Sequence, residues 1–403
     1  MSTIGYRFIS AGGLLVMFGI AFACSEDRNS IHFPIIPWGL ALQLALALFI
    51  LKTTPGLMIF EAAQGVFQQL IEFSDAGARF LFGELTTGEA YGAQVAFHVL
   101  PIIIFVSALS AILYHLKIIQ FVVRWAAKGM QKTMKTSGAE SVGAALFVFL
   151  GIESVTAIGE YVKEMTRSEL FVIMTAFLST VATSVMGAYV EFGAEAGHLL
   201  AASLMSAPAA VVIAKVMVPE RDEPVTAADV RFEPDLTTHN VLDAAANGAA
   251  QGVKLAVNVG ALLIAFVGLV HMANFVLEST VGMPLNTMFG YAFAPFAAAM
   301  GVPLEDVLEV GQLLGRKTVL NEFMAYQRMQ EMVEAGELTE RAHTISTYAL
   351  CGFANFGSIG ILLGGLRGVA PDQSHEVASL ALKALLAGTL AAFMTACWAG
   401  ILA

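Results

Sequence analysis

The 403-residue chain has few charged side chains: they make up 13% of its residues, whereas hydrophobic side chains make up 57%. Soluble globular domains average about 25% charged and about 45–50% apolar residues. The scarcity of charge excludes a disordered chain or a coiled coil, and three cysteines in apolar surroundings are too few for a disulfide framework. This composition is typical of a polytopic membrane protein.

Positive charge is particularly scarce, because 21 Lys and Arg residues stand against 32 Asp and Glu residues. A chain with a formal net charge of −11 and no basic stripe offers no surface to a polyanion, so we expect no nucleic-acid partner. The sequence also lacks an H-E-x-x-H motif and any Cys/His cluster. We therefore expect no metal centre.

Nine stretches without Asp, Glu, Lys or Arg reach about 18 residues, which is roughly the length of helix that crosses a bilayer. They are 8–25, 29–51, 90–116, 170–190, 196–214, 255–277, 279–304, 342–366 and 384–403. Three prolines in 279–304 indicate a short peripheral helix, which leaves eight spans. The first run ends in a sequence that resembles a signal-peptide cleavage site, but the second run follows at once, and we expect a retained helix.

The distribution of basic residues orients these spans. The loop after the third span carries five basic residues and no acid: Lys117, Arg124, Lys128, Lys132 and Lys135. Short loops rich in Lys and Arg stay in the cytoplasm, whereas loop 191–195 holds two acids and no base and suits the outside. Eight spans then place both termini outside, in a multi-pass protein of the cell (inner or plasma) membrane. Segment 54–85 is too polar to cross; its single apolar stripe predicts either an interfacial helix or a loop helix packed on the spans.

Two further segments, 142–163 and 305–332, are apolar enough to enter the bilayer but carry Glu153 and Glu322 in their middles, next to glycines. Neither half of either segment can cross alone, so we predict two re-entrant hairpins. An ionisable group at the bilayer centre costs about 2.5–3.5 kcal/mol, which makes both carboxylates functional candidates. The alternative is that they lie at hairpin bases near water, or pair with Arg316 or Lys317.

Small polar residues interrupt the spans that follow each hairpin, at 179–184 and at 352–358. The order of hairpin, interrupted span and span therefore occurs twice, and the two hairpins enter from opposite sides. This order predicts an all-α membrane protein in which an inverted repeat builds a substrate site near the midplane.

Two C-terminal stretches resemble signatures of the concentrative nucleoside transporter family. Residues 315–326 read GRKTVLNEFMAY and are similar to that family's G-x-K-x-x-x-N-E-F-x-A-[YF] motif. Residues 349–360 read ALCGFANFGSIG and resemble its C-G-F-A-N-x-x-S-I block. The resemblance runs from about residue 90 to the end. It implies a cation-coupled symporter that imports nucleosides by alternating access, as a homotrimer and without a covalent cofactor.

The resemblance also implies roles for individual residues. Glu322, Asn355 and Ser358 would bind the ribose, beside Asn321. Glu153 would take the place of the family's carboxylate in the first hairpin, with Ser154 next to it, and Val185 would make an apolar contact to the base. The family's Gln in this hairpin is missing here, since Ile152 follows Gly151. Sugar recognition is therefore expected to be intact and base recognition to be altered.

The coupling ion is less clear from the residues. The family commonly has an Asn sodium ligand where this chain has Phe147, so only backbone carbonyls, at Phe147 and Leu150, and the side chain of Thr180 remain as ligands. The ion is either Na+, bound there, or H+, carried by Glu153 or Glu322.

Two alternatives to an ordinary nucleoside importer stay open. The same fold could carry a modified nucleoside or another ribosyl compound. An intramembrane enzyme could use Glu153 and Glu322 as acid and base, although no nucleophile–base pair accompanies them. We expect four parts: N-terminal helices with an interfacial helix (1–89), a scaffold helix with the first hairpin and half of a transport core (90–218), a cytoplasmic linker (219–240) and the second half of the core (241–403).

Overall fold

The computed structural model describes residues 3–86, 95–225 and 238–403, and every regular element in these ranges is a helix. Among the described residues, seven helical segments are long and apolar enough to cross a membrane. They are α1 (Thr3–Ala23), α2 (Ile35–Lys52), Val95–His115 with α4 (Leu100–His115), Arg167–Glu191, α11 (Ala196–Met217), α12 (Val241–Thr280) and Pro371–Leu402 with α18 (Ser374–Leu402).

The eighth predicted span, 342–366, is divided into α16 (Glu340–Leu350) and α17 (Phe356–Val369). Arg167–Glu191 is divided in the same way, into α9 (Arg167–Ser179) and α10 (Thr183–Glu191). The two breaks lie against each other, because Gly352 has a φ of 148° and a Cβ there would come within 2.8 Å of the Ser179 carbonyl oxygen. Only glycine accepts both that conformation and that approach.

Each predicted hairpin is present and directly precedes a broken span. The first consists of α6 (Gly138–Leu146), α7 (Glu153–Ala157) and α8 (Gly159–Val162), and the second of α14 (Val307–Val319) and α15 (Glu322–Glu334). Ser137 and Glu140 form a capping box that starts the first hairpin. Such reciprocal caps satisfy amide groups that have no partner within the helix.

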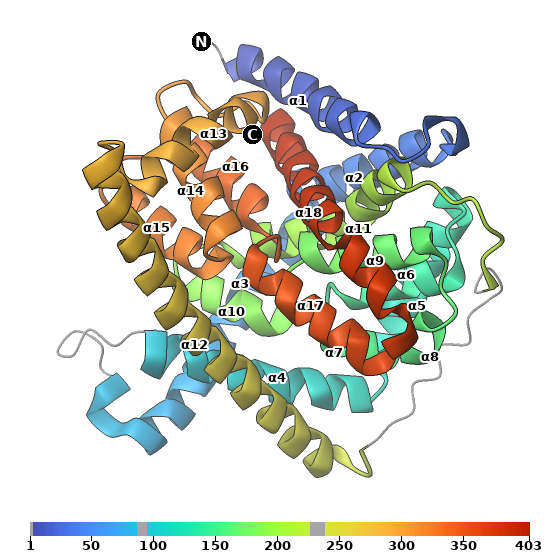
Figure 1. The fold of residues 1–403 in the computed structure, drawn as a ribbon. Coiled ribbons are helices and arrows are strands. Elements are labelled where there is room, and N and C mark those ends of the chain that lie inside the picture. The colour runs from blue at the N-terminus through green and yellow to red at the C-terminus, as the bar shows by residue number, and fades with distance from the viewer. Residues whose placement is uncertain (1–2, 87–94, 226–237) are drawn as a thin grey trace.

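The remaining helices surround this core (Figure 1). Segment 54–85 forms α3 (Thr54–Phe82), which contacts the start of α11 through Phe60 against Gly197 and through Gln64, whose Oε1 accepts from Ala196 N at 2.7 Å. Run 279–304 contains the short helix α13 (Leu285–Ala299), as its prolines predict. This helix packs on α14. The basic loop after α4 is itself a helix, α5 (Ile118–Met134).

Lipid-facing and buried helices differ plainly in exposure. α9 with α10, α11 and much of α18 are enclosed by other helices, whereas α12 runs across the front of the molecule with most of its apolar surface uncovered (Figure 1). The start of α1 and the end of α18 lie side by side, where Arg7 donates to the Ala403 carbonyl oxygen at 2.6 Å (Figure 1). Most of the predicted linker, 226–237, lies outside the described residues.

Candidate functional site

Four helix starts meet around one cavity. The beginnings of α7, α10, α15 and α17 all contribute to its wall, and α12 covers one side. The cavity encloses about 680 Å³, its open mouth included. Its lining includes Gly151, Ile152, Glu153, Phe177, Ala182, Ser184, Val185, Leu255, Val259, Leu262, Phe266, Leu320, Asn321, Glu322, Phe323, Phe353, Asn355, Gly357, Ser358 and Ile361. Helix N-termini carry partial positive charge, so this arrangement favours carboxylates and polar ligands.

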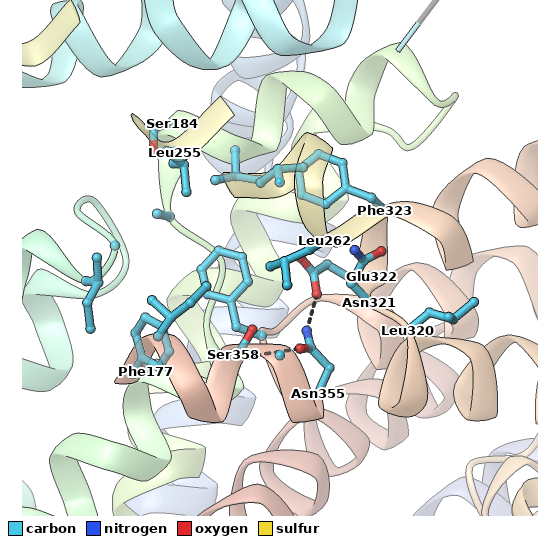
Figure 2. Close-up of a pocket in the computed structure, with 18 of the residues that line it drawn as sticks. Phe177, Ser184, Leu255, Leu262, Leu320, Asn321, Glu322, Phe323, Asn355 and Ser358 are labelled. Atoms are coloured by element: carbon cyan, nitrogen blue, oxygen red, sulfur yellow. Dashed lines mark hydrogen bonds between the residues drawn. The ribbon is translucent and has the colours of Figure 1, made fainter. Parts of the chain in front are cut away.

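Glu322 is the central polar group of the cavity and is only 3% exposed. Its Oε1 accepts from the Tyr189 hydroxyl at 2.9 Å and its Oε2 accepts from Asn355 Nδ2 at 2.8 Å; the second bond is drawn in Figure 2. The backbone amide of Glu322 also bonds to the carboxylate. A carboxylate has about four acceptor positions, so acceptor capacity remains for a ligand. The alternative partner Lys317 donates instead to the Ala349 carbonyl oxygen at 2.9 Å.

Asn355 holds Glu322 in place and is itself fixed. It is the N-cap of α17, where its Oδ1 accepts from Ser358 N at 2.7 Å (Figure 2). Asn321 caps α15 in the same way, with Oδ1 accepting from Met324 N at 3.1 Å. In both residues the helix uses the amide oxygen, so the amide NH2 group is left to donate beside the carboxylate. One hydrogen of the Asn355 NH2 group already bonds to Glu322.

An aromatic cluster packs beside Glu322. Tyr189 stacks on Tyr326 with ring centroids 4.6 Å apart and meets Phe323 edge-on at 5.0 Å. The Tyr326 hydroxyl donates to the Thr347 carbonyl oxygen at 2.8 Å, which fastens the second hairpin to the last turn of α16. Buried aromatic rings therefore enclose Glu322 on this side.

Glu153 occupies the other polar end of the cavity. Within the described residues no other side chain hydrogen-bonds to its carboxylate, which is met by the backbone amides of Gly151 and Glu153 itself. Ile152 packs against Gly365 of α17, and Val185 lines the cavity wall. Ser154 does not line the cavity; it is buried and its hydroxyl donates to the Leu150 carbonyl oxygen at 2.8 Å.

Of the residues predicted to bind a cation, Thr180 lies in the break between α9 and α10, and Phe147 and Leu150 lie between α6 and α7. Thr180 is buried, and its hydroxyl shares a 2.7 Å hydrogen bond with that of Ser206. The ring of Phe147 packs against that of Phe177, with centroids 5.6 Å apart. Because a phenyl ring has no oxygen atom, Phe147 can offer a cation only its main-chain carbonyl. The hard oxygen atoms at this place are therefore hydroxyl and main-chain oxygens, and the Leu150 carbonyl is already engaged by Ser154.

A second, larger cavity of about 2180 Å³ continues from the first, with which it shares Gly151, Glu153 and Ser184. Its wall reaches Tyr114 at the end of α4 and Thr238 before α12. Both positions are at the cytoplasmic end in the predicted orientation. In that orientation the second cavity extends the site towards the cytoplasm.

Several residues of the site, either in the cavity wall or, like Tyr189, behind it, were not found by sequence reasoning. Tyr189 offered a signal, since a hydroxyl in an apolar span is a candidate for a buried partner. Phe177 and Phe353 offered none, because an aromatic residue in a membrane helix is usually packing material. The same is true of the α12 residues Leu255, Val259, Leu262 and Phe266, which look like any lipid-facing side chains.

Three family models together match most of the chain. They are "Na+ dependent nucleoside transporter N-terminus" over residues 12–85, "Nucleoside recognition" over 96–196 and "Na+ dependent nucleoside transporter C-terminus" over 198–400.

Among curated relatives, the chain is 40% identical to "Solute carrier family 28 member 3" of Mus musculus over 98% of this chain and 59% of that protein. The chain thus spans about three fifths of the length of this mouse relative. It is 42% identical to "Uncharacterized transporter YutK" of Bacillus subtilis over 96% of this chain and 98% of that one. It is 37% identical to "Sodium/nucleoside cotransporter 1" of Rattus norvegicus over 98% of this chain and 64% of that protein.

Solved structures agree with the fold. CNTnw in an inward-facing substrate-bound state is 36% identical and superimposes with a TM-score of 0.92, covering 98% of this chain and 97% of that one. A variant of CNTnw in an outward-facing state is 35% identical, with a TM-score of 0.94 and 99% coverage of both chains. From these matches and the geometry above, the chain is a multi-pass membrane protein that belongs to the Na+-dependent nucleoside transporter family.

Proposed function

We propose that this protein is a secondary active transporter that imports nucleosides across the cell membrane by cation-coupled symport and alternating access. The observation that carries the proposal is a buried carboxylate, Glu322, held by Tyr189 and Asn355 and with acceptor capacity left for a ligand, in the wall of a cavity that continues into a second, larger one. Such a group is costly to bury unless a ligand completes its hydrogen bonds.

Ribose recognition is proposed for the second hairpin and α17. Two vicinal hydroxyls can donate to the free positions of the Glu322 carboxylate, in charge-assisted bonds that are stronger than neutral ones. Asn321, Asn355 and Ser358 surround the same carboxylate with donors for the ring and hydroxyl oxygens. An analogue without these hydroxyls leaves the charge unpaired and binds more weakly.

Base recognition is proposed for the first hairpin. Glu153 is an acceptor without a side-chain partner, and Val185 supplies an apolar wall. Ser154 supports the turn that carries Glu153 through its bond to Leu150. The apolar Ile152 beside Glu153 also favours a second candidate cargo, a modified nucleoside or other ribosyl compound whose base offers hydrogen-bond donors.

Sodium is the proposed coupling ion, because the family models and the rat relative carry it in their names. The proposed ligands are the Thr180 hydroxyl and main-chain oxygens at Phe147 and Leu150. Coupling to H+ through Glu153 or Glu322 is the alternative.

We further propose that the protein is not an enzyme and works as a homotrimer in the lipid bilayer. Among the described residues, no group of His, Cys, Asp or Glu beside the two carboxylates could hold a metal ion, and we expect the cargo to pass unchanged. The uncovered apolar face of α12 supplies surface that neighbouring copies can bury.

Uptake of labelled ribonucleosides into proteoliposomes tests the proposal. An imposed inward Na+ gradient should drive accumulation of chemically unchanged nucleoside, and a proton gradient of the same size should not. Empty liposomes and the Glu322→Gln variant are the controls. Absence of gradient-driven uptake for every ribonucleoside, or recovery of a cleaved product, would overturn it.

A further inference from the structure

α5 is a basic amphipathic helix on the cytoplasmic side that the transport cycle above does not use. One stripe of it faces the protein and is buried: Ile119, Val123, Ala127, Met130 and Met134. Through this stripe α5 contacts α6, α2 and α4. It therefore connects α4 to the start of the first hairpin.

The opposite face of α5 is exposed and carries large apolar side chains. Phe121 is 73% exposed and Trp125 is 80% exposed, and Lys128 and Lys132 continue the same face towards the end of the helix. Large aromatic side chains beside lysines are typical of helices that lie in the membrane interface, where the rings enter the acyl boundary and the ammonium groups stay at the headgroups.

The charge of this segment is of one sign. Residues 117–135 hold five basic side chains and no acid, in a chain whose formal net charge is −11. Within the described part of the chain, the lysines that form ion pairs lie elsewhere, and no carboxylate pairs with Lys117, Lys128, Lys132 or Lys135. These ammonium groups are available to an anionic partner outside the protein.

The backbone conformation at the two ends of α5 also distinguishes its lysines. Lys117 and Lys135, the residues that flank α5, have φ angles of 62° and 54° and are the two non-glycine residues with positive φ among those described. Glycine or asparagine is preferred in this conformation, because a Cβ crowds the following carbonyl. The chain therefore carries lysine at both corners of α5 despite a backbone that favours glycine.

We propose that α5 binds the headgroups of acidic phospholipids in the cytoplasmic leaflet. The lysines contact phosphate oxygens, and Phe121 and Trp125 lie at the level of the acyl chains. This contact ties the entrance of the first hairpin to the membrane surface. The occupant is a lipid surface because the face combines exposed aromatic rings with cations of one sign, a combination that suits an anionic bilayer.

Lipid titration of the purified full-length protein tests this inference. Phosphatidylglycerol is added to the protein in neutral detergent, with phosphatidylcholine as reference, and bound lipid is counted by native mass spectrometry. Lys128→Gln/Lys132→Gln should weaken phosphatidylglycerol binding about 30-fold, since each cation near the surface contributes roughly a factor of five. The matched control, Lys52→Gln/Arg79→Gln, removes two exposed charges from the opposite end of the molecule and should leave the affinity unchanged.

A second variant separates charge from structure. Lys117→Gly/Lys135→Gly relaxes both left-handed corners, so it should raise the melting temperature in neutral detergent and yet weaken phosphatidylglycerol binding. Thermal stabilisation by nucleoside checks that each variant is folded, and the glycine variant carries the test if the glutamine variant is not. Unchanged phosphatidylglycerol affinity in the folded variants, an equal loss in the control pair, or equal binding of phosphatidylcholine would overturn the inference.

Discussion

At the scale of single residues, the site depends on two carboxylates in unlike surroundings. Glu322 is held by Tyr189 and Asn355, so its orientation exists before any ligand arrives. Glu153 has no comparable side-chain partner in the described residues and faces both cavities. In the proposed function, Glu322 binds the part of the cargo that is constant, the sugar, and Glu153 faces the part that varies, the base.

Replacing Glu322 by Gln should weaken ribonucleoside binding by about 10- to 100-fold, because a charge-assisted hydrogen bond contributes roughly 1.5–3 kcal/mol. Tyr189→Phe removes a donor to the carboxylate without removing the charge, so it should have a smaller effect. Calorimetric titration of both variants with the same nucleoside measures the difference. Equal affinity of Glu322→Gln and the unmodified protein would contradict the assignment.

The base preference should follow from the chemistry of Glu153. An ionised carboxylate only accepts hydrogen bonds, so a base with an exocyclic amine is favoured over one that presents carbonyl oxygens. Guanosine should bind about 10-fold more tightly than inosine, which lacks only that amine. Glu153→Gln should reduce this ratio towards one in a thermal-shift titration. A ratio unaffected by this substitution would place the base elsewhere.

At the scale of elements, the sequence predicts segments in which polar residues or glycines interrupt an apolar run. It does not predict which side chains of a uniformly apolar helix line the site. The hairpins and the two broken spans were predictable because carboxylates, glycines and small polar residues interrupt apolar runs at those places. The segment between α4 and the first hairpin was predicted only as a basic loop, whereas in the structure it forms the helix α5. The wall contributed by α12 could not be predicted, since Leu262 and Ile264 are alike in sequence although one lines the cavity and the other is 80% exposed.

The junction of the two broken spans should be intolerant of side chains. Gly352→Ala introduces a Cβ that meets the Ser179 carbonyl and requires a φ that alanine rarely adopts, so it should destabilise the protein by about 2 kcal/mol or more. Gly360→Ala, in α17 with open space around it, should be neutral or stabilising. Melting temperatures of the two variants in one detergent give the comparison; equal values would mean that the breaks do not pack as described.

At the scale of the whole molecule, ion pairs join distant helices on the side that the sequence predicts to be cytoplasmic. Glu26, in the loop after α1, accepts from Arg167 at 2.8 Å and from Lys383 at 2.7 Å, and Arg167 also meets Glu376. The hydrogen bond from Arg167 is the largest cause that lowers the pKa of Glu26 to about 2. One carboxylate thus holds the ends of α1, α9 and α18 together.

This network predicts acid sensitivity. A carboxylate with a lowered pKa stabilises the fold above its unfolded pKa, near 4.5, and loses that contribution as the pH falls towards 2. Between pH 6 and pH 3 the unmodified protein should therefore lose more thermal stability than Glu26→Gln, which has no such group to protonate. At pH 6 the variant should be less stable by about 1–2 kcal/mol, because Glu26 is partly exposed and its bonds are screened. Parallel pH profiles of the two proteins would contradict this account.

A density map of the protein with bound ribonucleoside tests the central claim most directly. We predict that the 2′- and 3′-hydroxyl oxygens lie about 2.6–3.2 Å from the Glu322 carboxylate, with the base directed towards Glu153 and Val185. A nucleoside lying in the reverse direction, or outside the cavity between the two hairpins, would contradict it.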